Sequence, residues 1–284
     1  MIAEPVTAGG ETPPRASLEF GPARVARDNL PGGGFILRSP IALEPHAANI
    51  CDYLGEWAAR TPDRCFLAER DPEQSWRKLS YGEALRRVRA IAQALLARGL
   101  SEDHPVMILS DNGIENGLLQ LGAMYAGIPV APISPAYSLN SVDFGKLRHV
   151  FELIRPGLVF ASDGARFAPA LGALDLDDVE ILLTRNRPDG LESTAFAELA
   201  ATPVTAAVDA AAARVGPDSV AKILFTSGST GLPKGVINTH LMMCSNQQAI
   251  AQIWPFVTRR PPVLVDWLPW NHTFGGNHNF NMIL

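Results

Sequence analysis

The stretch Leu224-Phe-Thr-Ser-Gly-Ser-Thr-Gly-Leu-Pro-Lys-Gly235 decides the fold and most of the chemistry of this chain. It places several hydroxyl side chains, three glycines and one lysine between two apolar segments. Glycines allow backbone N–H groups to turn toward an anion, hydroxyls add donors, and the lysine adds positive charge. The stretch therefore predicts a loop that wraps a polyphosphate, and we expect that polyphosphate to be ATP. A solvated turn in a hairpin is the alternative, which the Pro-Lys-Gly ending disfavours.

The residues around this loop favour strands on both sides of it. A Walker A loop places Lys-Ser or Lys-Thr directly after its last glycine and then begins a helix. Here Pro233 precedes Lys234, and a Val-Ile pair follows the next glycine, so that a strand is favoured over a helix. We expect one strand over 220–225 and a second over 235–238.

An alternation of strand-like and helical patterns precedes the loop. Continuously apolar segments are typical of strands covered on both faces, and apolar residues at helical spacing indicate the helices between them. The expected strands are 65–69, 106–109, 128–131, 158–160 and 179–183, and the expected helices are 50–60, 81–98, 113–125, 141–154 and 164–174. Repeated strand–helix–strand units predict an α/β fold with parallel sheets flanked by helices.

Composition divides the chain into three expected parts. Residues 1–33 are rich in Gly, Pro and Ala and are expected to form a flexible leader. Residues 34–215 are expected to form a first α/β subdomain. Residues 216–284 would begin a second, incomplete α/β subdomain, with a helix over 240–254 and a strand over 263–265.

Polar residues and a glycine mark helix ends. Ser80 and Glu83 have the spacing of a capping box, and Gly99 is expected to end the helix that begins there. Asn112 is expected to cap the helix that ends at Tyr125.

Composition also disfavours several classes of function. The 284 residues are 47% hydrophobic, but no apolar run approaches the ~20 residues that a membrane span requires, and no signal peptide is recognisable. A net charge of −5 argues against nucleic acid as the main partner. Cys51, Cys65 and Cys244 lack metal-ligand spacing and fit reduced thiols in a cytoplasmic protein.

Four stretches of the sequence form an ordered set. They are Leu79-Ser-Tyr-Gly-Glu-Ala-Leu85, Gly122-Ala-Met-Tyr-Ala-Gly-Ile-Pro-Val-Ala-Pro132, Thr226–Gly235 and Trp270-Asn-His-Thr-Phe-Gly-Gly276. Together they resemble core motifs of the adenylate-forming enzymes, which include acyl- and aryl-CoA synthetases, luciferases and the adenylation domains of peptide synthetases. The later motifs of that family are not found, so the resemblance implies the N-terminal part of a synthetase, which is expected to be inactive alone.

The resemblance implies a nucleotide site in the third stretch. The phosphates of ATP would contact Thr226, Ser227, Gly228, Ser229, Thr230, Gly231 and Lys234. Mg²⁺ would bridge phosphate oxygens, because it prefers substrate phosphates and few protein ligands. Lys234 is also a candidate catalytic residue, and a solvated lysine on a hairpin is the alternative.

The fourth stretch is implied to bind the acid. His272 would lie beside the carboxylate as a second candidate catalytic residue, and Phe274 and Gly275 would line the acyl pocket with it. A histidine satisfied within a loop is the alternative. His272 and His278 could also form a metal pair, but no third ligand is evident, so no metal site made of side chains is predicted.

The implied reaction activates a small-molecule carboxylic acid with ATP and transfers it from the acyl-adenylate to coenzyme A. The stretches 265–277 and 35–40 are similar to feruloyl-CoA synthetases, which implies a hydroxycinnamate such as ferulate. A fatty-acyl-CoA ligase and a peptide-synthetase-type adenylation domain remain alternatives, as does a nucleotide-binding fragment without catalysis.

Overall fold

The computed structural model describes residues 18–71, 73–227 and 231–284. The described chain separates into a small unit and a large one. The small unit combines residues 18–42 with 250–262, and the large unit combines residues 43–249 with 263–284. The division expected at residues 33 and 215 stays a prediction.

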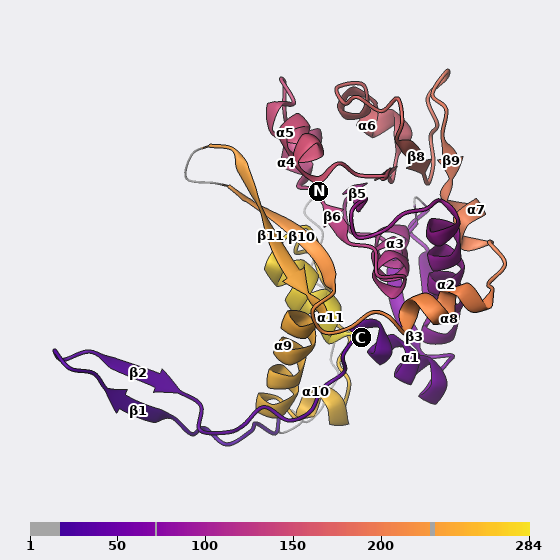
Figure 1. The fold of residues 1–284 in the computed structure, drawn as a ribbon. Coiled ribbons are helices and arrows are strands. Elements are labelled where there is room, and N and C mark those ends of the chain that lie inside the picture. The colour runs from indigo at the N-terminus through magenta and orange to yellow at the C-terminus, as the bar shows by residue number, and fades with distance from the viewer. Residues whose placement is uncertain (1–17, 72, 228–230) are drawn as a thin grey trace, which may run out of the picture. The chain divides into compact units, whose positions relative to one another are not determined.

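The small unit contains an antiparallel hairpin. Its strands are β1 (Ala26–Asn29) and β2 (Phe35–Arg38), and Asn29 pairs with Phe35 at the turn (Figure 1). Gly32 and Gly33 lie in that turn with φ near +92° and +91°, which glycine adopts without strain. The short helix α10 (Phe256–Arg259) belongs to the same unit.

A seven-stranded sheet organises the large unit, in the order β11-β10-β6-β5-β7-β8-β9. Its strands are β5 (Val106–Leu109), β6 (Val130–Pro132), β7 (Leu158–Ala161), β8 (Glu180–Leu183), β9 (Thr194–Ala195), β10 (Val220–Ser227) and β11 (Pro233–Thr239). The pairs are parallel except for β10 and β11, which form an antiparallel hairpin at one edge. The predicted α/β fold is therefore confirmed.

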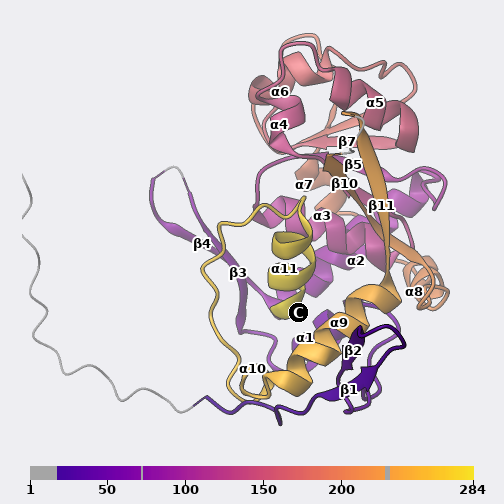
Figure 2. The same cartoon turned by 90° about the vertical axis from the view of Figure 1, so that its left-hand side faces the viewer.

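Helices cover both faces of this sheet. The helices are α1 (Cys51–Arg60), α2 (Tyr81–Ala97), α3 (Ile114–Tyr125), α4 (Pro135–Ser138), α5 (Gly145–Ile154), α6 (Gly164–Leu171), α7 (Phe196–Ala200), α8 (Ala206–Ala212), α9 (His240–Ile253), the π-helix η1 (Phe274–Asn279) and α11 (Phe280–Met282). Figure 2 shows β5 and β7 between the pair α5 and α6 and the pair α2 and α3.

The strand β5 shows how the two layers form. Val106 and Ile108 pack into the cluster that contains α1, α2 and α3 residues. Met107 and Leu109 pack into the cluster that contains α5 and α6 residues. All four side chains are buried, because successive side chains of a strand point to opposite faces and both faces are covered.

Most predicted elements are found within a few residues of their expected ends, but two predictions are wrong. Residues 263–265 lie outside any strand. Asn112 does not cap α3, because Gly113 is the N-cap and Glu69 accepts a hydrogen bond from the Ile114 N–H at 2.8 Å. Half of the expected capping box is present, since the Ser80 hydroxyl accepts from the Glu83 N–H at 3.3 Å.

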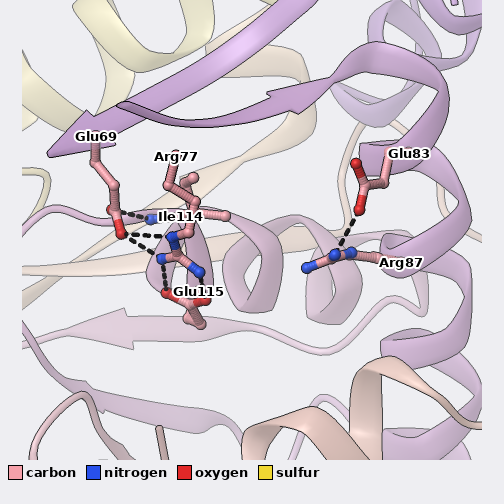
Figure 3. A network of polar contacts seen from close by, with 6 residues as sticks. All are labelled: Glu69, Arg77, Glu83, Arg87, Ile114 and Glu115. Atoms are coloured by element: carbon pink, nitrogen blue, oxygen red, sulfur yellow. Dashed lines mark hydrogen bonds and ion pairs between the residues drawn. The ribbon is translucent and has the colours of Figure 1, made fainter. Parts of the chain in front are cut away.

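A second hairpin, β3 (Cys65–Arg70) with β4 (Trp76–Ser80), joins α3 through an ionic network (Figure 3). Arg77 lies between the carboxylates of Glu69 and Glu115, with its Nη2 atom 2.7 Å from Glu115 Oε2. Burial alone would raise the pKa of Glu115, but the hydrogen bond and charge of Arg77 lower it. The network fixes the start of α3, directly after the loop that ends β5.

Among the described residues, no helix is both long and apolar enough to cross a membrane. The same residues contain no group of three or more His, Cys, Asp or Glu side chains placed to hold a metal ion.

Candidate functional site

The antiparallel hairpin β10–β11 carries the predicted phosphate loop. Both expected strands are present and extend further toward the loop than predicted. Thr226 pairs with Lys234, and Ser227 pairs with Pro233, so the two strands meet directly below the loop. Both Thr226 and Lys234 are exposed. Gly228, Ser229 and Thr230 lie outside the described residues.

A pocket of about 400 Å³ lies at the tip of this hairpin. Gly231 and Leu232 form one wall, and the segment from Ala136 to Lys146 forms the other. The Nε2 atom of His149, on α5, lies 3.1 Å from the carbonyl oxygen of Pro233, so α5 supports the hairpin at this point. The tip of the hairpin is thus held against a second, polar segment of the chain.

Sequence analysis missed the two charged residues of this pocket. Lys146 lies in the first turn of α5, with its Nζ atom 5.7 Å from the centre of the Tyr137 ring. Asp143 accepts hydrogen bonds from the Gly145 N–H at 3.1 Å and the Ser141 hydroxyl at 3.2 Å, and these bonds lower its pKa. Neither residue belongs to a recognisable motif, so only their position in space associates them with the loop.

A second pocket, of about 430 Å³, lies at the other end of β11. It is lined by Asn238, Met242, Met243, Asn246, His272, Thr273, Phe274, Asn277 and His278. The structure therefore brings His272 and Phe274 together in one pocket. Amides, thioethers and rings form the lining, and none of the lining residues is a carboxylate, a lysine or an arginine.

The π-helix η1 presents these residues. The side chain of His272 is exposed, and its Nδ1 atom accepts a hydrogen bond from the Phe274 N–H at 3.3 Å. Phe274 is 51% exposed, and its ring centre lies 4.9 Å from that of His278. π-Helical turns are rare and frequently occur at functional sites.

Gly275 acts by its small size and does not line the pocket. A Cβ atom on Gly275 would lie 2.3 Å from the carbonyl oxygen of Pro269, and one on Gly276 would lie 2.3 Å from that of Trp270. Two consecutive glycines are thus needed for the π-helix to pack on the preceding segment. The position of His272 follows from this close approach.

Asn112 fixes the same segment from the carboxyl end of β5. Its Nδ2 atom donates to the Leu268 carbonyl at 2.8 Å, and its Oδ1 atom accepts from the Trp270 N–H at 2.9 Å. Asp266 accepts from the Trp270 indole N–H at 3.0 Å. In open α/β sheets, ligands bind beyond the carboxyl ends of the parallel strands. The position of Asn112 shortly after β5 is therefore a sequence signal that could have identified it.

Lys222 is a further residue that the sequence motifs did not identify. It is fully buried in β10, and its Nζ atom donates to the Gly276 carbonyl at 3.0 Å. Burial lowers the pKa of Lys222 to about 7. Burial, together with the charge of Lys222, also lowers the pKa of His240 to about 4. A lysine within the otherwise apolar strand expected over 220–225 could have indicated a buried amine.

Comparisons with known proteins agree with this arrangement of elements. Residues 54–284 match the family described as AMP-binding enzyme. The chain is similar to 4-coumarate–CoA ligase-like 9 of Arabidopsis thaliana, with 30% identity over 69% of this chain and 33% of the relative. It is also similar to indigoidine synthase of Streptomyces lavendulae, with 31% identity over 66% of this chain and 13% of the relative.

A solved structure shows the same fold. The fatty acyl-adenylate ligases from E. coli and L. pneumophila match with a TM-score of 0.62 and 22% identity, over 84% of this chain and 40% of that chain. The chain therefore spans about a third of the plant relative and less than half of the solved structure.

Proposed function

Because the chain belongs to the AMP-binding enzyme family, we propose that it takes part in activating a carboxylic acid with ATP, through an acyl-adenylate, for transfer to coenzyme A. One observation carries this proposal: a single hairpin bears both pockets. Gly231 and Leu232 line one pocket at its tip, and Asn238 lines the other where β11 ends. An adenylation reaction requires such a joint framework, because a phosphate site and an acid site must be held in a fixed relation.

The phosphate end is proposed to work by charge and positioning. Thr226 and the loop residues after it would donate hydrogen bonds to the phosphates, and Lys234 would offset the negative charge that accumulates there. The exposure of Thr226 and Lys234 supports this role. Mg²⁺ would be bound through phosphate oxygens, because it prefers substrate phosphates and few protein ligands.

The acid end supports a carboxylic acid whose remaining part is aromatic and uncharged. Phe274 and two methionines offer apolar contacts for a planar ring, and Asn238, Asn246 and Asn277 offer hydrogen bonds to ring oxygens. An amino acid would require a counterion for its ammonium group, and the lining has no carboxylate. A fatty acid would make no use of these amides. We therefore propose a hydroxycinnamate such as ferulate. The plant relative is itself named for 4-coumarate.

Acid-dependent exchange of pyrophosphate into ATP tests the function. The full-length protein that the gene encodes would be assayed with ferulate, 4-coumarate, benzoate, palmitate and an amino acid mixture. We expect kcat/KM to be highest for the two hydroxycinnamates. A preference for palmitate would favour a fatty-acyl ligase, a preference for an amino acid would favour a peptide-synthetase-type domain, and no exchange with any acid would favour a non-catalytic module.

Three variants test the residue roles. His272→Ala should lower kcat/KM for every acid, because it acts at the carboxylate end that all of them share. Phe274→Ala should affect aromatic acids most, because it removes a ring contact. Thr230→Ala should slow exchange with all acids equally. We also propose that the protein acts in the cytoplasm, where its three cysteines would stay reduced.

A further inference from the structure

Lys222 is a lysine buried in the strand β10. Its side chain is 0% exposed, and among the described residues no ion pair includes it. Its described polar contact is the Gly276 carbonyl at 3.0 Å, and the face of the Phe280 ring lies 5.4 Å from Nζ. Burying a charged amine lowers the free energy of unfolding unless the amine is paired and hydrogen-bonded.

The contact with Gly276 connects Lys222 to the acid pocket, because the backbone of Gly276 also bonds to His272. The Gly276 N–H donates to the His272 carbonyl at 2.8 Å, while its own carbonyl accepts from Lys222. His272 and Phe274 lie on this turn, and both line the acid pocket. A displacement of Gly276 would therefore displace the two residues proposed to hold the acid.

Lys222 also belongs to the strand that leads to the phosphate loop. Thr226 follows it by four residues on β10 and pairs with Lys234 across the hairpin. One hydrogen bond from the Lys222 side chain thus joins β10, the strand that leads to the phosphate loop, to the turn that bears His272 and Phe274. Asn112 holds the preceding segment to β5, so the turn is fixed from two separate strands.

We propose that Lys222 is a positioning residue that fixes the turn bearing His272 and Phe274 relative to the strand of the phosphate loop. This inference depends on the proposed function for its effect on activity, but the positioning itself is a property of the chain. A methionine of similar length would pack in the same space without a buried charge, which is often neutral or favourable for stability. A role in positioning and a role in stability therefore predict different results.

The first part of the test compares the kinetic constants of variants with those of wild type. In the full-length protein, Lys222→Met should raise KM for ferulate by about tenfold, the effect of one lost hydrogen bond at a buried charged donor. KM for ATP should stay within about twofold, because the loop is not contacted. Lys222→Gln retains an N–H donor and should recover part of the effect. Lys78→Met, at an exposed lysine of β4, is the matched control and should change neither constant.

The second part of the test does not need activity. Hydrogen–deuterium exchange of the 284-residue chain should be faster in peptides covering 268–282 for Lys222→Met, and unchanged over the strands β5 and β7. If wild type shows no acid-dependent exchange of pyrophosphate but this local change is observed, the proposed function fails and the positioning role stands.

Three results would overturn the positioning role. They are an unchanged KM for ferulate with a lowered melting temperature, an unchanged exchange pattern over 268–282, and a failure of both Lys222→Met and Lys222→Gln to fold. The third result would make Lys222 a requirement of folding.

Discussion

The central strands and the edge hairpin follow opposite rules. In β5, β7 and β8, nearly every side chain is apolar and buried between two helical layers. In the hairpin and the segment 266–284, the buried positions include a lysine, two glycines in close contact with carbonyl oxygens, and a π-helix. Departures from regular patterning tend to collect at functional sites. On the proposed function, the chemistry lies at the edge of the sheet, and the buried apolar strands supply stability at its centre.

Arg77, in the separate hairpin β3–β4, and Lys222, in β10, differ in their polar partners. Arg77 is partly exposed and lies between two carboxylates, as is usual for a structural ion network. Lys222 is buried and contacts a carbonyl oxygen instead. Arg77 could be replaced at a modest loss of stability, whereas Lys222 is expected to matter for the geometry of the pocket.

The largest effect is expected in the central strands. Phe160→Ala should lower the free energy of unfolding by ~3–5 kcal/mol, because Phe160 is fully buried and packs on Phe196 with 5.7 Å between ring centres. KM values of the folded fraction should not change. Urea unfolding measures the loss, with the half-exposed Leu153→Ala as a control. A changed KM for ferulate would contradict the assignment of stability to the central strands and of acid binding to the edge of the sheet.

The hairpin should show the reverse behaviour. Lys234→Ala should slow acyl-adenylate formation by ~10²–10³-fold, because it removes positive charge from developing negative charge. Its stability should hardly change, since Lys234 is exposed. Pyrophosphate exchange and urea unfolding would be measured together, with Lys78→Ala as the control. Exchange within about twofold of wild type would remove Lys234 from the site.

A pair of glycine variants sharpens the comparison further. Gly276→Ala should cost ~1–3 kcal/mol and raise KM for the acid, because its Cβ atom would lie 2.3 Å from the Trp270 carbonyl oxygen. Gly55→Ala, on α1, should instead stabilise by ~0.5–1 kcal/mol, since nothing lies within 4 Å of its Cβ position. Thermal unfolding distinguishes them. Equal effects would mean that the close approach of η1 does not hold in solution.

The last effect concerns pH. The pKa of Lys222 falls from 10.5 to about 7 on folding, so between these values the unfolded chain binds more protons and the stability of wild type rises with pH. The slope is at most ~1.4 kcal/mol per pH unit. Burial raises the pKa values of Cys51 and Cys244 above 9.0, which lowers stability above that pH and limits the window to pH 7–9.

Lys222→Met should lack this slope. Urea unfolding at pH 7, 8 and 9 measures it, and parallel curves for the variant and wild type would contradict the lowered pKa.

Sequence reasoning succeeded where the pattern is repetitive. Strand β5 was predicted at its observed ends, because four consecutive apolar residues between polar ones allow little choice. The two strands of the hairpin β10–β11 were predicted because glycine and proline residues separate two apolar segments. His272 and Phe274 came from a resemblance, and the structure places both in one pocket.

What the sequence did not reveal depends on contacts between distant residues. Asn112 reads as a helix cap, but its partners lie 156 and 158 positions further along the chain. Residues 263–265 have strand-forming side chains, and Val263 and Val265 are more than 90% exposed without a strand partner. Lys146 joins the phosphate pocket only because α5 packs beside β11.

The attachment of the segment 266–284 also bears on how the chain folds. The segment is held by Asn112, by Lys222 and by the hydroxyl of Tyr81, which donates to the Ile283 carbonyl across 202 positions of sequence. Contacts of such separation form slowly, because the loop between the partners must first be closed. During synthesis, the central strands and their helices are made first and can become ordered before this segment emerges. We expect the acid pocket to mature late, and a nascent chain to contain a formed sheet before it can bind an acid.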